Sequence, residues 1–331
     1  MLMVLAHSRF SVYGNYWINM FHMPLFFFFA GYCFKEKYLS EFKTFALNRI
    51  RGIYKPYVKW GLIFLLLHNV FFSLLIYNDK YGYQGGINHA YTSTDFYHHA
   101  LLIVTAMRGH DGLLGGYWFL KSLFWSSFIG YLSIRYISRQ FQTVLCLLAT
   151  ITLCFFNLKI PYFQIGSTET LGATFYLIGY YMKTTALNFN LNITNSIILS
   201  VLSLVLITIG MQYWQATMKT VMWWEVVPYT ITAIMGTITV FVISKHIDKS
   251  ENSILKNALI YIGNTTLTIL TWHFLCFKLV SFVIVLVYNL PLERIGEHPA
   301  IEEYSMLGWF IAYFVVGITI PQFFSKFKFL R

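Results

Sequence analysis

Long apolar runs recur along almost the whole chain, and they restrict its fold more than any other feature. A run of about 18 or more apolar residues can cross the hydrocarbon core of a bilayer as a helix, whereas irregular backbone cannot face lipid there. Nine runs reach or approach this length: residues 17–34, 55–77, 117–135, 141–157, 170–186, 193–212, 226–245, 265–288 and 305–325. We therefore predict an all-α integral membrane protein.

The first residues, MLMVLAHSRF, look like the second half of one further span. As a helix they would cover only about 14 Å, which is roughly half of the hydrocarbon thickness. A start codon placed too late would explain the short length, and a re-entrant segment is the alternative. We expect a bundle of about ten transmembrane helices, the first of them truncated, in a single domain over residues 1–331.

Composition supports a membrane protein over a soluble one. Only 11% of the residues are charged and 57% are hydrophobic, whereas a soluble domain carries about 25% charged residues. The net charge of +11 comes from basic residues that cluster between apolar runs, so lipid headgroups or an anionic cofactor are expected partners and nucleic acid is not. The four cysteines lie in apolar runs without CxxC spacing, which disfavours a disulfide framework or a zinc site.

The orientation follows from the positive-inside rule. Basic residues gather at 35–59, at Arg135 and Arg139, at 245–256, and in a tail with Lys326, Lys328 and Arg331. Ten crossings place all of these on the cytoplasmic side, together with both termini. The stretches 78–116 and 289–304 then lie outside. The first is rich in Gly, His and Tyr, and it forms either a lid of short interfacial helices or a solvated loop.

Ionisable side chains inside membrane spans are costly, so each one is a functional candidate. Four ionisable residues in the predicted spans are candidates for this reason: His7, His22, Lys121 and His273. A neutral imidazole is the cheapest general base to bury, which favours His7 as a catalytic residue. Helix packing through a hydrogen bond is the alternative role for His7.

The other three have equally open alternatives. His22 precedes Pro24, which can kink a helix and leave carbonyls open to a substrate, but His22 could also reach lipid headgroups. Lys121 could contact an acidic group or snorkel to the interface, and His273 could contact a substrate or be structural.

Two arginines lie in NRIRGIYKPY, where the third span begins. Guanidinium groups bind phosphate in a bidentate manner, so Arg49, Arg51 and the neighbouring Lys55 could seat a nucleotide or pyrophosphate. Positive-inside anchoring is the simpler explanation of the same residues.

At these residues the chain resembles the integral membrane acyltransferases of acyltransferase family three, especially the fucose 4-O-acetylase-like branch. LMVLAHS at 2–8 resembles the end of the family's first helix, FHMPLFFFFAGYCFK at 21–35 its second, and NRIRGIYKPY its arginine motif. YWFLKSLF at 117–124 and YIGNTTLTILTWHF at 261–274 resemble its fourth-span and late-helix motifs. Family members carry a basic residue about ten positions before the histidine, and this chain begins too late to include it.

The resemblance implies a non-aminoacyl acyltransferase of the bacterial inner membrane, spanning residues 1–331. It uses acetyl-CoA or another acyl-CoA as donor and a hydroxyl of an envelope glycan or lipid-linked sugar as acceptor, with no metal. His7 would be essential for transfer, and Arg49 and Arg51 would handle acyl-CoA. Tyr117 could stack on a sugar face, although interfacial tyrosines are common without a ligand.

Two other functions remain open from the sequence. The polar residues could line the path of a glycan or small-molecule transporter, but the two-fold internal repeat typical of transporters is not visible. The chain could also be an inactive truncated product.

Overall fold

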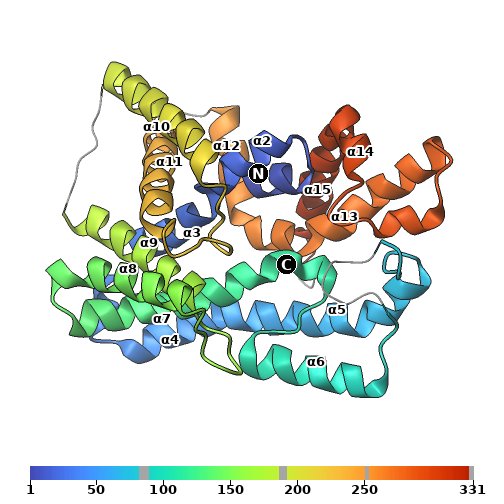
Figure 1. Ribbon diagram of the computed structural model, residues 1–331, viewed down its shortest axis with the longest axis horizontal. Coiled ribbons are helices and arrows are strands. Elements are labelled where there is room, and N and C mark those ends of the chain that lie inside the picture. Colours follow the sequence, from blue (N-terminus) through green and yellow to red (C-terminus); the bar gives the residue numbers. More distant parts are fainter. Residues whose placement is uncertain (82–88, 186–191, 250–252, 328–331) are drawn as a thin grey trace. The chain divides into compact units, whose positions relative to one another are not determined.

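The computed structural model (Figure 1) describes residues 1–81, 89–185, 192–249 and 253–327. Every secondary-structure element within these ranges is a helix, which confirms the all-α prediction. The predicted basic residues Lys328 and Arg331, and most of the YGYQGG stretch at 81–86, lie outside the described residues.

Four helical segments are long and apolar enough to cross a membrane. They are α10 (Ile193–Tyr213), α11 (Val226–Asp248), α13 (Thr266–Val287) and the stretch Glu302–Phe324, which ends with α15 (Phe310–Phe324). Helices also occupy three less apolar runs, as α5 (Lys55–Ser73), α7 (Trp118–Tyr136) and α9 (Ser167–Thr184), and α8 (Arg139–Phe155) is apolar but shorter. The total of about ten crossings stays a prediction.

The chain forms two compact units. Unit 1 comprises Met1–Asn15, Tyr54–Trp118 and Asn257–Arg331. Unit 2 comprises Tyr16–Ile53 and Phe119–Lys256. A single domain over residues 1–331 therefore stays a prediction.

Unit 2 depends on a very close contact between α3 (His22–Tyr32) and α9. A Cβ atom on Gly31 would lie 1.8 Å from the carbonyl oxygen of Tyr176, and one on Gly179 would lie 2.0 Å from that of Phe28. Only glycine fits at these two positions because backbone meets backbone there. α10 and α11, yellow and orange in Figure 1, pack along each other in the same unit.

The predicted span at 17–34 is interrupted. α2 (Val12–Asn19) ends before Met20, and α3 begins at His22. Pro24 is the third residue of α3, a position where its missing N–H has no partner within the helix in any case. Pro24 therefore lies in the first turn of a new helix instead of kinking a long one.

Unit 1 is organised around α13 and α15, which pack along each other. The six-residue helix α1 (Leu2–His7) lies against α15, where a Cβ atom on Gly317 would come within 2.9 Å of Val4 Cγ1. After α1 the backbone turns sharply at Arg9, whose φ is 57°. The hydroxyl of Ser305 donates a hydrogen bond to the carbonyl oxygen of Ser8 and so fixes this turn.

The stretch at 78–116 contains short helices, which decides between the two predicted forms. α6 (Ser93–Ala106) starts with a capping box in which Thr92 and Asp95 bond to each other's backbone N–H groups. Ile103 of α6 is fully buried against Gly61 of α5. Residues 89–116 of this segment are therefore a packed part of unit 1 and not a solvated loop.

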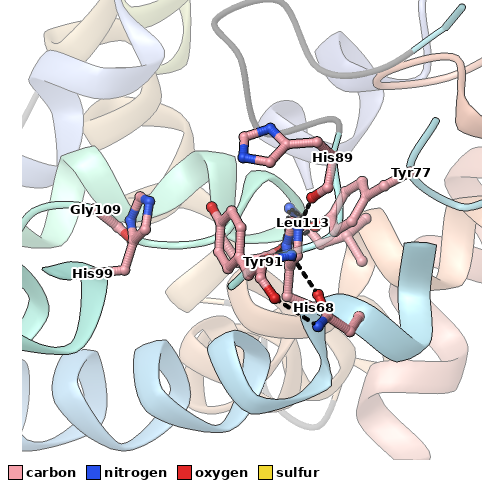
Figure 2. A network of polar contacts seen from close by, with 9 residues as sticks. His68, Tyr77, His89, Tyr91, His99, Gly109 and Leu113 are labelled. Atoms are coloured by element: carbon pink, nitrogen blue, oxygen red, sulfur yellow. Dashed lines mark hydrogen bonds and ion pairs between the residues drawn. The ribbon is translucent and has the colours of Figure 1, made fainter. Parts of the chain in front are cut away.

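A buried polar network holds this segment on α5 (Figure 2). His68 Nε2 donates to the carbonyl oxygen of His89 at 2.8 Å, and His68 Nδ1 lies 2.9 Å from Asp111 Oδ2. Asn69 makes hydrogen bonds of 2.7 and 3.0 Å with the backbone of Tyr91. We call His68, Asn69 and Asp111 the His68 clamp.

Aromatic rings enclose the clamp. The His68 ring stacks against Tyr91 at 3.6 Å and against Tyr77 at 4.9 Å between centroids, and the Tyr77 hydroxyl donates to Asp111. Burial raises the pKa of Asp111, whereas the hydrogen bond with His68 opposes that change. Because both ring nitrogens of His68 are engaged within the fold, we assign the clamp a structural role.

Replacing one member of the clamp should destabilise the protein more than replacing two. His68→Leu leaves the Asp111 carboxyl buried without its nitrogen partner, and loss of one member of a buried pair costs about 3–5 kcal/mol. His68→Leu with Asp111→Leu should recover part of this loss. Thermal unfolding in detergent micelles measures the effect, with the exposed His98→Leu as control. A double variant less stable than His68→Leu would contradict the assignment.

Candidate active site

His7, the last residue of α1, meets His273 of α13. The two residues are 266 positions apart in the chain, and His7 Nδ1 lies 3.0 Å from His273 Nε2. Their rings stack with centroids 5.3 Å apart. His7 is half-buried, whereas His273 is fully buried. The structure thus brings together two of the histidines that the sequence selected separately.

The backbone of α13 determines which nitrogen of each ring carries the proton. His273 Nδ1 lies 2.9 Å from the carbonyl oxygen of Ile269 and 3.1 Å from that of Leu270. A carbonyl oxygen only accepts, so His273 Nδ1 must carry the hydrogen. In a neutral ring, His273 Nε2 is then an acceptor, and His7 Nδ1 must donate to it. This tautomer leaves the lone pair of His7 on Nε2, as a general base requires.

Phe274 gives this histidine pair an aromatic neighbour. Its ring centroid lies 4.7 Å from that of His7 and 4.6 Å from that of His298. The Phe274 ring also lies 4.0 Å from the ring of His273 between centroids, so three imidazoles surround one phenyl ring within unit 1.

Tyr117 is in the same unit, at the end of η3 (Gly112–Tyr117). Its side chain is fully buried, and its hydroxyl lies 2.7 Å from the hydroxyl of Thr271 on α13. This contact packs η3 on the same helix that carries His273. The predicted role of Tyr117 in binding a sugar stays a prediction.

His22 and Lys121 belong to unit 2, where each has partners within the fold. His22 is buried, and its Nδ1 donates to the carbonyl oxygen of Ile18 at 2.8 Å. Lys121 Nζ donates to the carbonyl oxygen of Gln164 at 2.7 Å and lies 3.9 Å from Glu169 Oε1. Lys121 therefore ties the loop before α9 to α7, and substrate binding by His22 and Lys121 stays a prediction.

The predicted phosphate-binding residues differ in exposure. Arg49 ends α4 (Phe42–Arg49), where its guanidinium lies over the Phe45 ring and donates to the Tyr176 hydroxyl at 3.4 Å. Arg51 is exposed in η2 (Ile50–Tyr54), a π-helical turn, which is a feature frequent at functional sites. Lys55 is also exposed and begins α5 in unit 1. Phosphate binding by these three residues stays a prediction.

Two further ionisable residues of unit 1, Lys278 and His298, were not predicted from the sequence. Lys278 is 4% exposed on α13, and its Nζ donates to the carbonyl oxygen of Glu297 at 2.6 Å. It lies inside the predicted span 265–288, so the rule on ionisable residues in spans should have selected it. His298 gave no such signal, because it lies in a stretch with the composition of a loop.

A metal centre finds no support among the residues that the structure describes. No three His, Cys, Asp or Glu side chains in that part of the chain gather as ligands for an ion.

Comparison with known proteins identifies the family. The family model described as an acyltransferase domain matches residues 1–326 of the 331. No curated protein and no solved structure matches the chain. With its apolar helices and a match over nearly its full length, this chain belongs to the acyltransferase-3 family of multi-pass membrane acyltransferases.

Proposed function

We propose that this chain is an O-acyltransferase of the bacterial inner membrane, in the fucose 4-O-acetylase-like branch, with both termini in the cytoplasm. It moves an acyl group, most simply acetyl, from acyl-CoA to a hydroxyl of an envelope glycan or lipid-linked sugar. The observation that carries the proposal is the hydrogen bond between His7 Nδ1 and His273 Nε2 at 3.0 Å, because it leaves the lone pair of His7 on Nε2.

The reaction that we propose needs one base and no metal. His7 Nε2 takes the proton of the sugar hydroxyl while the hydroxyl oxygen bonds to the thioester carbonyl carbon. The carbon–sulfur bond then breaks, and the coenzyme A thiolate receives the proton from His7. His273 orients the His7 ring and accepts its Nδ1 hydrogen throughout, so His273 is a positioning residue.

The donor would be held by cations on the cytoplasmic side. Arg51 and Lys55 are exposed, whereas Arg49 donates to the Tyr176 hydroxyl. Guanidinium and ammonium groups match the phosphates of coenzyme A. A transporter is the weaker candidate because the family is one of acyltransferases.

His7→Ala should abolish acyl transfer. Loss of a general base costs about 100-fold to 10,000-fold in rate. The measurement is O-acetylation of the surface glycan in cells that carry the variant, with the amount of protein in the membrane as control. Retained acetylation would refute the role of His7. If the wild-type chain itself transfers no acyl group, the alternative that this chain is an inactive truncated product would be favoured instead.

His273→Leu should lower kcat by on the order of 10-fold to 100-fold, as loss of an orienting partner does in other sites, with little change in KM. Leucine has no atom that accepts a hydrogen bond from His7 Nδ1–H. In His273→Gln, the amide oxygen of the glutamine can accept this bond. The Gln variant should therefore retain more activity than the Leu variant. Equal kcat values in the two variants would show that His273 acts only through packing.

Arg51→Glu should raise the KM for acyl-CoA by at least about 10-fold, since one hydrogen bond to a charged group contributes about 1.5–3 kcal/mol. The KM for the acceptor should change little. Arg135→Ala is the matched control, because Arg135 is another basic residue of unit 2 and donates to the Leu39 carbonyl oxygen. Equal increases in both KM values would indicate misfolding.

A further inference from the structure

Lys278 is a buried lysine that has no carboxylate partner among the described residues. Its side chain lies halfway along α13, is 4% exposed, and donates to the backbone carbonyl of Glu297 at 2.6 Å. Among the described residues, no carboxylate oxygen lies within salt-bridge distance of Lys278 Nζ. A buried ammonium that meets only a neutral dipole is costly, so an anion bound beside Lys278 would stabilise its charged form.

The nearby carboxylates are bound to arginines. Glu297 Oε1 accepts from Arg294 Nε at 2.5 Å and acts on Lys278 only through its longer-range charge. Glu303 lies 3.3 Å from the same guanidinium, and Glu302 lies 3.9 Å from Arg9 Nε. The carboxylates of Glu297, Glu302 and Glu303 are therefore paired with arginines, which leaves the ammonium of Lys278 able to pair with another anion.

His298 and Phe274 connect the Lys278 ammonium group to the proposed base. His298, next to the residue that holds Lys278, packs on Phe274, and the Phe274 ring also contacts His7. Burial, and then the positive charge of Lys278, lower the pKa of His298 well below its ordinary value, with smaller contributions from His273 and Arg9. A neutral His298 carries no charge that would compete with Lys278 for an anion.

We propose that Lys278, with His298, forms an anion-binding site beside His7 that holds a carboxylate or phosphate of the sugar acceptor. This inference rests on the proposed function, which assigns the phosphates of the donor to the arginines at 49 and 51. Lys278 is bonded to the segment 289–304, which the charge pattern places outside, on the side from which an envelope glycan would enter. The site therefore selects acceptors that carry a negative charge near the hydroxyl to be acylated.

Binding of small sugars tests this without requiring turnover. The full chain, purified in detergent micelles, is titrated by calorimetry with methyl glucuronide, glucose 1-phosphate and neutral methyl glucoside. The wild-type chain should bind at least one of the two anionic sugars at least 10-fold more tightly than the neutral one. The preferred anion distinguishes a sugar acid from a sugar phosphate. A wild-type chain that binds all three equally overturns the inference.

Lys278→Met should lower the affinity for the anionic sugar until it equals the affinity for the neutral sugar. Lys80→Met is the control, because Lys80 is an exposed lysine of the same unit, paired with Glu293. Should Lys278→Met not fold, Lys278→Gln removes the charge while keeping an N–H donor for the Glu297 carbonyl. A preference for anions that survives loss of the charge also overturns the inference.

His7→Ala separates the two proposals. This variant should lose acyl transfer and keep its preference for the anionic sugar. Loss of the preference in Lys278→Met alone therefore concerns the anion site, whereas loss of transfer in His7→Ala concerns the proposed function.

Discussion

In an apolar solvent a polar side chain must find its partner inside the protein, and the helices of this chain often supply that partner from their own backbone. Thr150, Thr174 and Thr230 each donate to the carbonyl oxygen four residues earlier. His273 makes the same kind of hydrogen bond to its own helix, because its Nδ1–H faces the carbonyls of Ile269 and Leu270. In the threonines it only satisfies a hydroxyl. In His273 it also fixes the tautomer, and this determines which nitrogen of His7 keeps the lone pair.

The distribution of cations fits the two anionic ligands that we propose. Arg51 and Lys55 are exposed, which favours a large mobile ligand with several phosphates. Lys278 is buried and rigidly bonded, which favours one small anionic group in a fixed position. Electrostatic interactions are stronger in a region without water, so a single buried ammonium can contribute as much selectivity as several surface charges.

Hydropathy located most helices to within a few residues, because burial in lipid and the α-helical hydrogen-bond pattern act on the same stretch of chain. It did not reveal the break at Met20 and Phe21, since both residues are as apolar as their neighbours. The cost of ionisable groups in spans selected His7 and His273, yet it could not pair residues 266 positions apart. The same argument applies to His68 and Lys278, which lie inside the predicted spans 55–77 and 265–288 but were not predicted as site residues.

The glycine contacts between α3 and α9 have a mechanical consequence. Each helix places a backbone atom where the other lacks a side chain, at Gly31 and at Gly179, so sliding along or rotation about either axis would bring main-chain atoms into collision. The pair therefore behaves as one rigid rod. Any rearrangement within unit 2 therefore has to carry α3 and α9 together, and only its other helices can shift relative to this pair.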